Sequence, residues 1–134
     1  MSTRMLTRYL KLQLMKKINL GQKEIIHFVG IGGIGMSGLA QIMKNMGFKI
    51  QGSDQSKNKN TASCLKAGIK IFIGHSKKNV KSSTIVVRSS AIKNNNSEIK
   101  YAKEKKIPVY SRADVLADAC LLYTSDAADE KVRG

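Results

Sequence analysis

The chain has 134 residues, of which 42% are hydrophobic and 25% are charged, with 11 glycines and a single proline. This length and composition are typical of one globular domain and exclude a disordered or collagen-like protein. The formal net charge is +15, from 24 Lys and Arg against 9 Asp and Glu. Taken alone, that charge indicates a nucleic acid or an anionic membrane surface as partner.

The distribution of the charge argues against both partners. Residues 57–106 carry thirteen basic and two acidic groups, whereas residues 25–56 carry only Lys44, Lys49 and Asp54. Most basic residues are lysines, while proteins that read base edges favour arginine, and aromatic residues make up only 5% of the chain. No apolar run reaches the roughly 18 residues of a membrane span. We therefore expect neither nucleic-acid binding nor membrane insertion.

The cysteines and histidines do not form a metal site. Cys64 and Cys120 make no C-x-x-C pair and do not combine with His27 and His75 at any familiar ligand spacing. We expect two reduced thiols, with Cys64 as a small core residue. His27 falls inside a buried apolar run, which favours a hydrogen-bonded core histidine.

From Glu24 onward, apolar runs alternate with helical patterns. The spacing predicts strands at residues 25–29, 48–52, 69–73, 84–88 and 107–110. A helix is predicted after Gly35, where Leu39, Ile42, Met43 and Met46 recur at helical spacing. Further helices are predicted at residues 59–67 and from Arg112 onward. Another is predicted to be capped by Asn96 or Ser97 and to run to about residue 105, with Glu98 in its first turn. This alternation predicts a doubly wound, parallel α/β sheet of about five strands.

A glycine motif follows the first strand. Gly30, Gly32 and Gly35 match G-x-G-x-x-G, in which the glycines allow a tight turn, close approach to a phosphate and helix–sheet packing. Free N–H groups at the start of the next helix favour a diphosphate, to which Ser37 would add a hydroxyl. Asp54 ends the second strand, where such folds place a carboxylate that accepts from ribose hydroxyls. These features predict nucleotide-diphosphate binding without identifying the nucleotide.

The stretch from His27 to Gly38, HFVGIGGIGMSG, resembles the N-terminal signature of the Mur ligases. Further matches in the same order are Gly52-Ser53-Asp54, Gly74-His75, Ser89-Ser90-Ala91-Ile92, Ile107-Pro108-Val109 and the run from Arg112 to Ala117. Within that family the resemblance favours the branch that adds L-alanine to a sugar nucleotide over the branch that recycles murein peptides. It implies a Rossmann-like fold in a bacterial cytoplasmic protein of peptidoglycan synthesis.

The resemblance also implies the ligand, which is UDP-N-acetylmuramate in place of NAD. Carried over, the expected UDP-sugar site consists of Gly30, Gly32, Gly33, Ile34, Gly35, Met36, Ser37, Asp54, His75, Ser89, Ser90 and Ala91. A surface position for His75 and an ordinary strand-end turn at Ser89 and Ser90 remain open as alternatives. The Lys77, Lys78 and Lys81 cluster is interpreted as a solvated loop.

Three segments are expected. Residues 1–21 are interpreted as a short helical extension outside the fold, with a membrane-surface helix or an organelle presequence as alternatives. Residues 22–120 are expected to form the UDP-binding domain, and residues 121–134 are interpreted as an aberrant tail. The resemblance implies further domains that hold ATP and Mg²⁺, and we expect these 134 residues to contain neither the ATPase nor the C-terminal domain, since no G-x-x-x-x-G-K-[ST] loop occurs in them. We therefore expect no bound cofactor, no catalytic residue and no ligation by this chain.

Two other interpretations remain open. The same fold serves NAD(P)-dependent oxidoreductases and regulatory nucleotide sensors, so an NAD(P)-binding domain is the main alternative. A basic nucleic-acid-binding module is the second, although the composition argues against it.

Overall fold

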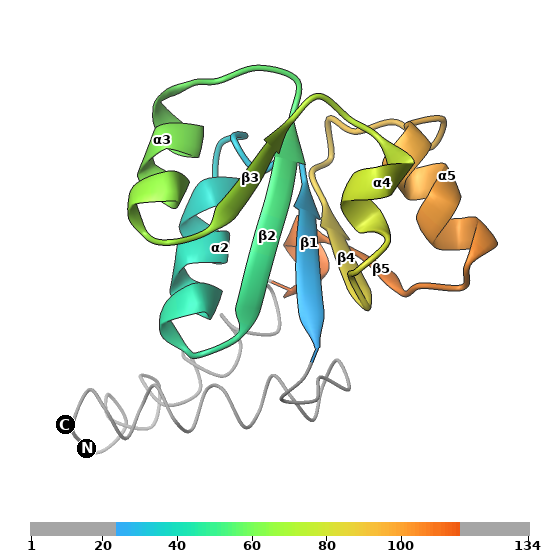
Figure 1. Ribbon diagram of the computed structural model, residues 1–134, viewed down its shortest axis with the longest axis horizontal. Coiled ribbons are helices and arrows are strands. Elements are labelled where there is room, and N and C mark those ends of the chain that lie inside the picture. Colours follow the sequence, from blue (N-terminus) through green and yellow to red (C-terminus); the bar gives the residue numbers. More distant parts are fainter. Residues whose placement is uncertain (1–23, 116–134) are drawn as a thin grey trace, which may run out of the picture. The chain divides into compact units, whose positions relative to one another are not determined.

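Strand β1 lies at the centre of a sheet of five parallel strands in the computed structural model, which describes residues 24–115 (Figure 1). In chain order the elements are β1 (Ile25–Val29), α2 (Met36–Asn45), β2 (Lys49–Asp54), α3 (Lys59–Lys66), β3 (Lys70–Ile73), α4 (Lys77–Val80), β4 (Ile85–Arg88), α5 (Ser97–Glu104) and β5 (Val109–Ser111). All of them belong to the compact unit Gln22–Arg112. Each predicted strand is present, with ends that differ by up to two residues.

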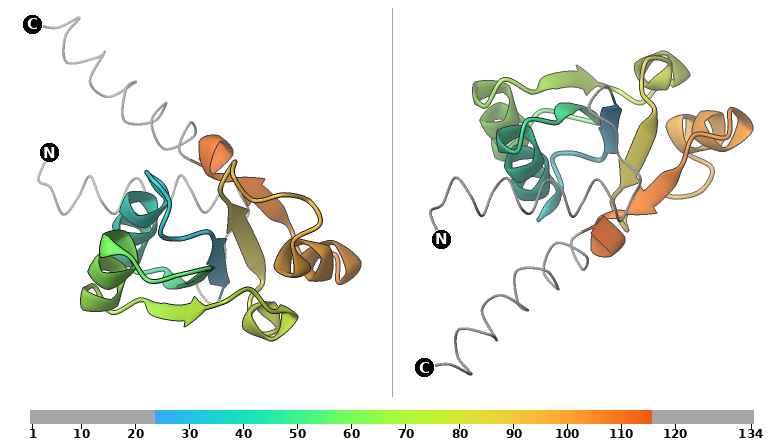
Figure 2. Two further views of the ribbon diagram at one scale, coloured as in Figure 1. Left: turned by 90° about the horizontal axis from the view of Figure 1, so that it is seen from above. Right: turned by 90° about the horizontal axis from the view of Figure 1, so that it is seen from below.

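The strand order is β3-β2-β1-β4-β5, and every neighbouring pair is parallel. Helices α2 and α3 cover one face, and α4 and α5 cover the other (Figure 2). The predicted doubly wound, Rossmann-like sheet is therefore confirmed. The connection that follows β1 runs toward β2, and the connection that follows β4 runs to the opposite side, toward β5. Because the two connections diverge, a crevice opens between the carboxyl ends of β1 and β4.

The core forms on both faces of β1. Ile26, Phe28 and Val29 are completely buried, as a strand covered by helices on both sides requires. On the α4 and α5 side, a cluster of Val29, Val80, Val86, Ile99 and Ala102 joins these helices to the sheet. The continuous apolar run in the sequence reported this double burial correctly.

Helix α2 packs against the sheet through part of its predicted apolar face. Leu39 and Met43 are buried, but Ile42, which recurs at the same helical spacing, is 53% exposed. The reason is geometric, because the face that meets the sheet is narrower than the stripe of apolar residues. Gly47, with φ of 99°, follows the helix as a C-terminal glycine in the left-handed conformation.

Helix α4 replaces the loop expected around Lys77 and Lys78. The Ser76 side chain caps it by accepting from the N–H of Lys78, and Asn79 and Val80 turn inward and are buried. The lysines themselves are exposed, as expected. A single turn of helix is too short to leave a periodic pattern, which explains why the sequence did not reveal it.

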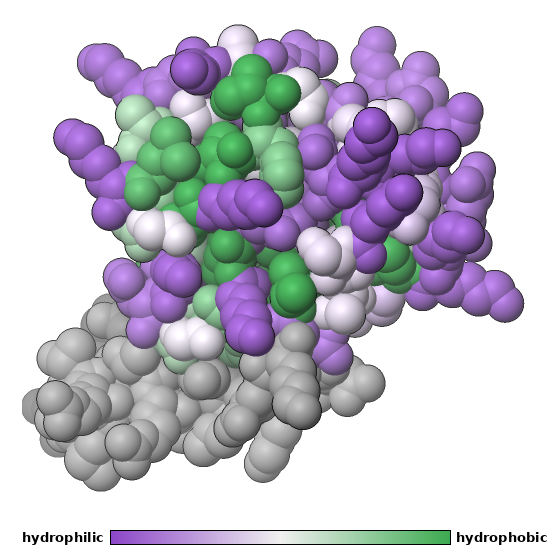
Figure 3. All heavy atoms as spheres, viewed as in Figure 1, coloured by the Kyte–Doolittle hydropathy of each residue, from purple (hydrophilic) through white to green (hydrophobic). Residues whose placement is uncertain are grey.

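The lysine-rich part of the chain covers the surface around α4 and α5, where hydrophilic side chains gather at the right of Figure 3. In the described part of the chain, no helix has the length and apolar character to cross a bilayer. The predicted extension, the tail and Cys120 lie outside the described residues, so their interpretations stay predictions.

Candidate functional site

The glycine loop, Gly30–Gly35, turns sharply at the end of β1 and folds over the end of β2. Gly30 has φ of 81°, a left-handed conformation that glycine adopts without steric cost. The N–H groups of Gly30 and Ile31 both donate to the carbonyl oxygen of Ser53, at 2.9 and 3.0 Å. The N–H of Gly33 donates to the carbonyl of Gly30 at 3.0 Å. The first part of the loop is therefore shaped by the chain itself.

Asp54 holds the middle of this loop. Its Oδ2 accepts from the N–H of Gly32 at 2.8 Å, and its Oδ1 accepts from the N–H of Gln55 at 2.8 Å. The side chains of Asn58 and Asn60 donate to the carbonyl of Gly32, at 3.2 and 2.9 Å. Gly32 thus meets protein groups as well as the space for a ligand. Each carboxylate oxygen keeps a further lone pair for a ligand donor.

The start of α2 supplies the open amides. Met36 donates to Gly33 at 3.1 Å, but the amides of Ile34, Gly35, Ser37 and Gly38 make no hydrogen bond to any described residue. Unpaired N–H groups at a helix N-terminus, with the positive end of the helix dipole, favour an anion. The donors available to a phosphate therefore lie in the second half of the loop and in the first turn of α2.

Arg112 lies against this open end of the loop. A methyl group built at Gly35 would fall 2.8 Å from its Nη1, so the guanidinium contacts the backbone there. Gly35 has φ of 81°, which together with this approach restricts the position to glycine. Arg112 was not among the predicted site residues, although it follows the last strand at the carboxyl edge of the sheet. That position was the available signal.

A cavity of about 280 Å³ opens at the carboxyl edge of the sheet. It lies between the glycine loop and the segments that follow β2, β3 and β4. Its walls are formed by Gly30, Gly32, Gly33, Asp54, Gln55, Asn58, His75, Ser89, Ala91 and Ile92. Most of the predicted UDP-sugar site is thereby brought together. Ile92 belongs to the Ser89–Ile92 loop that was expected at this pocket, whereas Gln55 and Asn58 were missed, since nothing in the local sequence marks a loop residue as facing a cavity.

The other predicted site residues lie outside the cavity wall. Met36 is completely buried and Ser37 is 8% exposed, so both side chains face the protein more than solvent. Ile34 is 95% exposed. Gly35 and Ser90 complete this group. Ile34, Gly35 and Ser37 therefore offer their backbone N–H groups, while Met36 packs the start of α2 onto the sheet.

Ser89 forms a strand-end turn and also lines the cavity. Its hydroxyl accepts from the N–H of Ala91 at 3.2 Å, and its carbonyl accepts from the N–H of Ile92 at 3.1 Å, which is an ordinary serine turn. The same residue lines the cavity. A methyl group at Gly30 would meet Ile92 at 3.2 Å and Cβ of Ser89 at 3.3 Å, so the turn lies close to the glycine loop.

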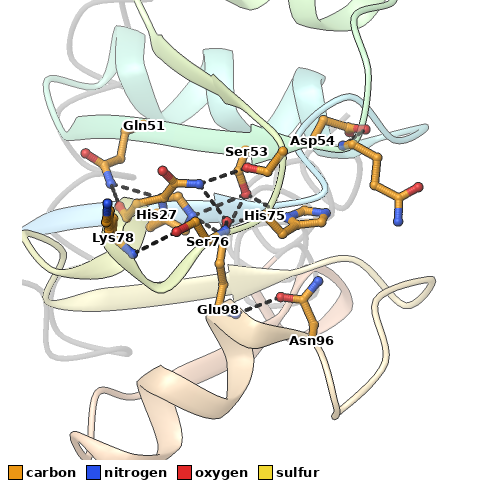
Figure 4. A network of polar contacts seen from close by, with 12 residues as sticks. His27, Gln51, Ser53, Asp54, His75, Ser76, Lys78, Asn96 and Glu98 are labelled. Carbon is orange, nitrogen blue, oxygen red and sulfur yellow. Dashed lines mark hydrogen bonds and ion pairs between the residues drawn. The ribbon is translucent and has the colours of Figure 1, made fainter.

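His75 stands between the cavity and a buried polar network (Figure 4). Its Nδ1 lies 3.1 Å from Oγ of Ser53 and 3.4 Å from Oε2 of Glu98. Its side chain is 10% exposed. The alternative of a freely exposed surface histidine is therefore wrong, because the buried hydrogen-bonding groups beneath the ring draw it inward.

Glu98, at the start of α5, is the centre of that network and is completely buried. Its Oε1 lies 2.6 Å from Nε2 of His27 and 2.6 Å from Oγ of Ser53. Its Oε2 accepts from the N–H of Ser76 at 3.0 Å and from Nδ2 of Asn79 at 2.9 Å. We expected Glu98 only to favour the first turn of a helix. Its long-range contacts could not be read from the local pattern.

The partners of Glu98 keep it ionised. Burial opposes ionisation and alone would raise the pKa of Glu98, but the hydrogen bond and electrostatic attraction of His27 oppose this effect. Together with the hydrogen bonds from Ser53 and Asn79, they lower the pKa to about 2 from the ordinary 4.5. A negative charge is therefore fixed behind one wall of the cavity.

His27 and Cys64 occupy the places predicted for them. His27 is completely buried and hydrogen-bonded to Glu98 and to Gln51, whose Nε2 lies 2.9 Å from Nδ1. Cys64 is buried and free, and burial raises the pKa of its thiol. Among the described residues no group of three or more His, Cys, Asp or Glu side chains is placed to hold a metal ion.

Comparisons of this chain with a family model and with curated proteins agree on one family. Residues 25–124 match the model of the Mur ligase family, catalytic domain. The UDP-N-acetylmuramate–L-alanine ligase of Pelagibacter ubique (strain HTCC1062) is 62% identical over 102 residues, which cover 76% of this chain and 22% of the relative. The chain thus spans about a fifth of the length of the curated relatives it matches.

Solved structures agree with the sequence relatives. The crystal structure of UDP-N-acetylmuramate-alanine ligase from Thermotoga maritima is 35% identical with a TM-score of 0.63, covering 78% of this chain and 23% of that one. A murein peptide ligase from Psychrobacter arcticus is 25% identical with a TM-score of 0.66, covering 71% of this chain and 20% of that one.

Proposed function

The chain belongs to the Mur ligase family, and from this premise we propose that residues 22–120 form its UDP-binding domain, with UDP-N-acetylmuramate as the ligand. The observation that carries the proposal is the cavity of about 280 Å³ between the glycine loop and the ends of β2, β3 and β4. Ligand pockets commonly begin near 300 Å³, so this one accommodates part of a sugar nucleotide. The remainder of the ligand extends outside it.

The charge and donor pattern supports a diphosphate at the open end of the loop. The guanidinium of Arg112 lies there, together with the backbone amides that have no hydrogen-bond partner among the described residues, which are those of Ile34, Gly35, Ser37 and Gly38. Guanidinium and backbone N–H groups are the usual donors to phosphate oxygens. The diphosphate accordingly binds against the first turn of α2.

The cavity wall itself suits the hydroxyl-bearing parts of the ligand. It contains no Lys or Arg among its described residues, and its polar groups include Asp54, Asn58, His75 and Ser89. A carboxylate repels phosphate and accepts from hydroxyl groups. Asp54 therefore serves the ribose hydroxyls of the uridine end, and it also keeps the loop in shape.

Binding, without catalysis, is the proposed role of these 134 residues. The sequence has no G-x-x-x-x-G-K-[ST] loop for ATP, and the described residues offer no cluster of metal ligands. The residues present therefore do not fit ATP and Mg²⁺, which in a complete ligase would be held by other domains. Mixing the chain with UDP-N-acetylmuramate, L-alanine and MgATP should release no phosphate above background.

Ligand titration tests the binding proposal. In a thermal-shift series, UDP-N-acetylmuramate should raise the melting temperature, and UDP should raise it less, while NAD, NADP and ATP should leave it unchanged. Selective stabilisation by NAD or NADP would instead establish the oxidoreductase or sensor alternative. Binding to duplex DNA that persists in moderate salt would establish the nucleic-acid alternative.

A pair of charge-neutralising variants tests the diphosphate position. Arg112→Gln should weaken binding of UDP-N-acetylmuramate by about tenfold to a hundredfold, because a charge-assisted hydrogen bond is worth about 1.5–3 kcal/mol. Lys66→Gln removes the same charge from an exposed site in the last turn of α3 and should leave the affinity within about twofold of wild type. Equal effects from both variants would mean that general electrostatic attraction, not contact with Arg112, holds the ligand.

The remaining parts of the proposal concern the branch of the family and the cellular location. The higher identity to the L-alanine ligase than to the murein peptide ligase supports the L-alanine branch of the family. A bacterial cytoplasmic location is consistent with the free thiol of Cys64 and with the bacterial relatives. Both branches use UDP-N-acetylmuramate, so the second substrate distinguishes them: a complete ligase that contains this domain should join L-alanine to the sugar nucleotide, whereas ligation of the tripeptide L-alanyl-γ-D-glutamyl-meso-diaminopimelate instead would establish the recycling branch.

A further inference from the structure

The buried network around Glu98 allows its hydrogen atoms to be assigned. The shortest contact of the Ser53 hydroxyl is to Oε1 of Glu98, at 2.6 Å, and its distance to Nδ1 of His75 is 3.1 Å. A hydroxyl has one hydrogen, and an ionised carboxylate is the stronger acceptor. Ser53 therefore donates to Glu98, and its oxygen presents a lone pair to His75.

His75 must then carry a hydrogen on Nδ1. That nitrogen faces the lone pair of Ser53 at 3.1 Å and Oε2 of Glu98 at 3.4 Å, and both of these atoms are acceptors. An unprotonated Nδ1 would place three lone pairs together in a largely buried space, which is unfavourable. Nε2 makes no hydrogen bond with any described residue. Figure 4 shows the ring at the edge of the network, on the side of Asp54.

His27 has the opposite arrangement. Gln51 donates one amide hydrogen to the carbonyl of Asn79 at 2.8 Å, which fixes the orientation of its amide, and the same nitrogen lies 2.9 Å from Nδ1 of His27. Nδ1 of His27 is therefore an acceptor, and Nε2 donates to Glu98 at 2.6 Å. One carboxylate thus receives Nε2–H from one histidine and Nδ1–H from the other.

We propose that Glu98 is a positioning residue of the sugar-nucleotide pocket, which holds His75 with Nδ1–H toward the interior and leaves Nε2 as an acceptor at the cavity. The proposal rests on the function proposed above. An imidazole Nε2 lone pair repels phosphate oxygens and accepts from a hydroxyl or amide N–H. His75 therefore selects a hydroxyl-bearing part of the ligand, and it acts at a different place from the diphosphate donors near Gly35.

The geometry explains why a residue of α5 controls a residue that follows β3. Glu98 also binds the N–H of Ser76 and the side chain of Asn79, so it fixes the segment on which His75 stands. Asn79 in turn donates to the carbonyl of Gly74 at 2.9 Å, which secures the other side of His75. Both the ring and its backbone are held by one side chain.

Nitrogen NMR tests the tautomers directly. The chain contains only two histidines, so a histidine-labelled sample gives two imidazole systems, which His75→Gln assigns. In the ligand-free wild type we expect Nδ1–H for His75 and Nε2–H for His27, so each histidine is a control for the other. Nε2–H on His75 would overturn the proposal, and this result requires neither a ligand nor a folded Glu98 variant.

Affinity measurements test the link to the ligand. Glu98→Gln should weaken UDP-N-acetylmuramate about tenfold, whereas Gln51→Met, which breaks contacts to His27 and Asn79 only, should change it less than about threefold. In a His75→Gln background, Glu98→Gln should have no further effect, because both changes then act through the same contact. Additive losses would refute the positioning role. If the wild type does not bind UDP-N-acetylmuramate, the proposed function is refuted. The tautomers measured by nitrogen NMR would still decide whether Glu98 orients His75.

Discussion

The buried carboxylate of Glu98 makes acid stability the most direct quantitative test of the structure. Glu98→Gln replaces it with a neutral side chain of the same shape. The folded pKa of Glu98 is about 2 against an ordinary 4.5, and a difference of that size corresponds to about 3 kcal/mol at pH 7. The variant should therefore be less stable than wild type by about 3 kcal/mol at neutral pH.

The sign of the pH dependence follows from the direction of the shift. Because folding lowers the pKa of Glu98, its stabilisation is fully present above about pH 4.5 and is lost as the pH falls toward 2. The difference between wild type and Glu98→Gln should accordingly shrink to about 2 kcal/mol at pH 3.5. Other carboxylates affect both proteins alike and cancel in the difference.

Urea unfolding followed by far-ultraviolet circular dichroism at pH 7 and pH 3.5 measures this difference. Glu104→Gln is the matched control, since Glu104 ends the same helix but is exposed, and it should stay within about 0.5 kcal/mol of wild type at pH 7. A gap for Glu98→Gln that stays constant or widens on acidification would show that Glu98 is not held ionised by the network.

Two further predictions concern packing. Gly52→Ala should destabilise the fold by about 3 kcal/mol in the same urea assay, because its methyl group would lie 2.5 Å from Cδ1 of Ile31 and 2.9 Å from the carbonyl oxygen of Phe28. Gly38→Ala should instead stabilise the fold by about 1 kcal/mol, because its methyl group would meet no described atom within 4 Å outside the backbone of its own helix. Equal effects of the two substitutions would contradict this packing. Cys64 should resist alkylation in the folded chain and react on unfolding, because its thiol is buried and burial raises the pKa of the thiol. Peptide mass spectrometry after alkylation measures this difference. Rapid labelling of Cys64 under native conditions would be inconsistent with its burial.

The polar network around Glu98 also determines how α4 and α5 pack on the sheet. Among the described residues, no buried side-chain nitrogen or oxygen lacks a hydrogen-bond partner. Burying Glu98 without its partners would cost several kcal/mol, so the donors from His27, Ser53 and Asn79 have to be present together. The network joins β1, β2, α4 and α5, and it therefore specifies how the two helices meet the sheet.

Local sequence patterns were sufficient for most of the fold. The double burial of β1 follows from its continuous apolar run, and the sharp turn at Gly30 follows from the position of that glycine after a strand. The alternation of strands and helices then restricts the sheet to the parallel, doubly wound class. The sequence did not reveal helix α4, because a single turn of helix has no period. The exposure of Ile42 was not foreseen either, because periodicity does not report how wide the buried face of a helix is.

The sequence by itself determined the five strands, the helices of eight or more residues, their order, and the edge of the sheet at which the glycine loop, Asp54 and Ser89 would meet. Only the tertiary structure decided which groups remain open to a ligand. The N–H of Gly32 donates to Asp54, 22 residues away, while the amide of Gly35 lies beside Arg112 and has no hydrogen-bond partner in the described part of the chain. The same holds for Glu98, which contacts His27 across 71 residues. A glutamate in the first turn of a helix has the same local pattern whether it faces water or the interior. Its burial and charge depend on distant donors that only folding brings together.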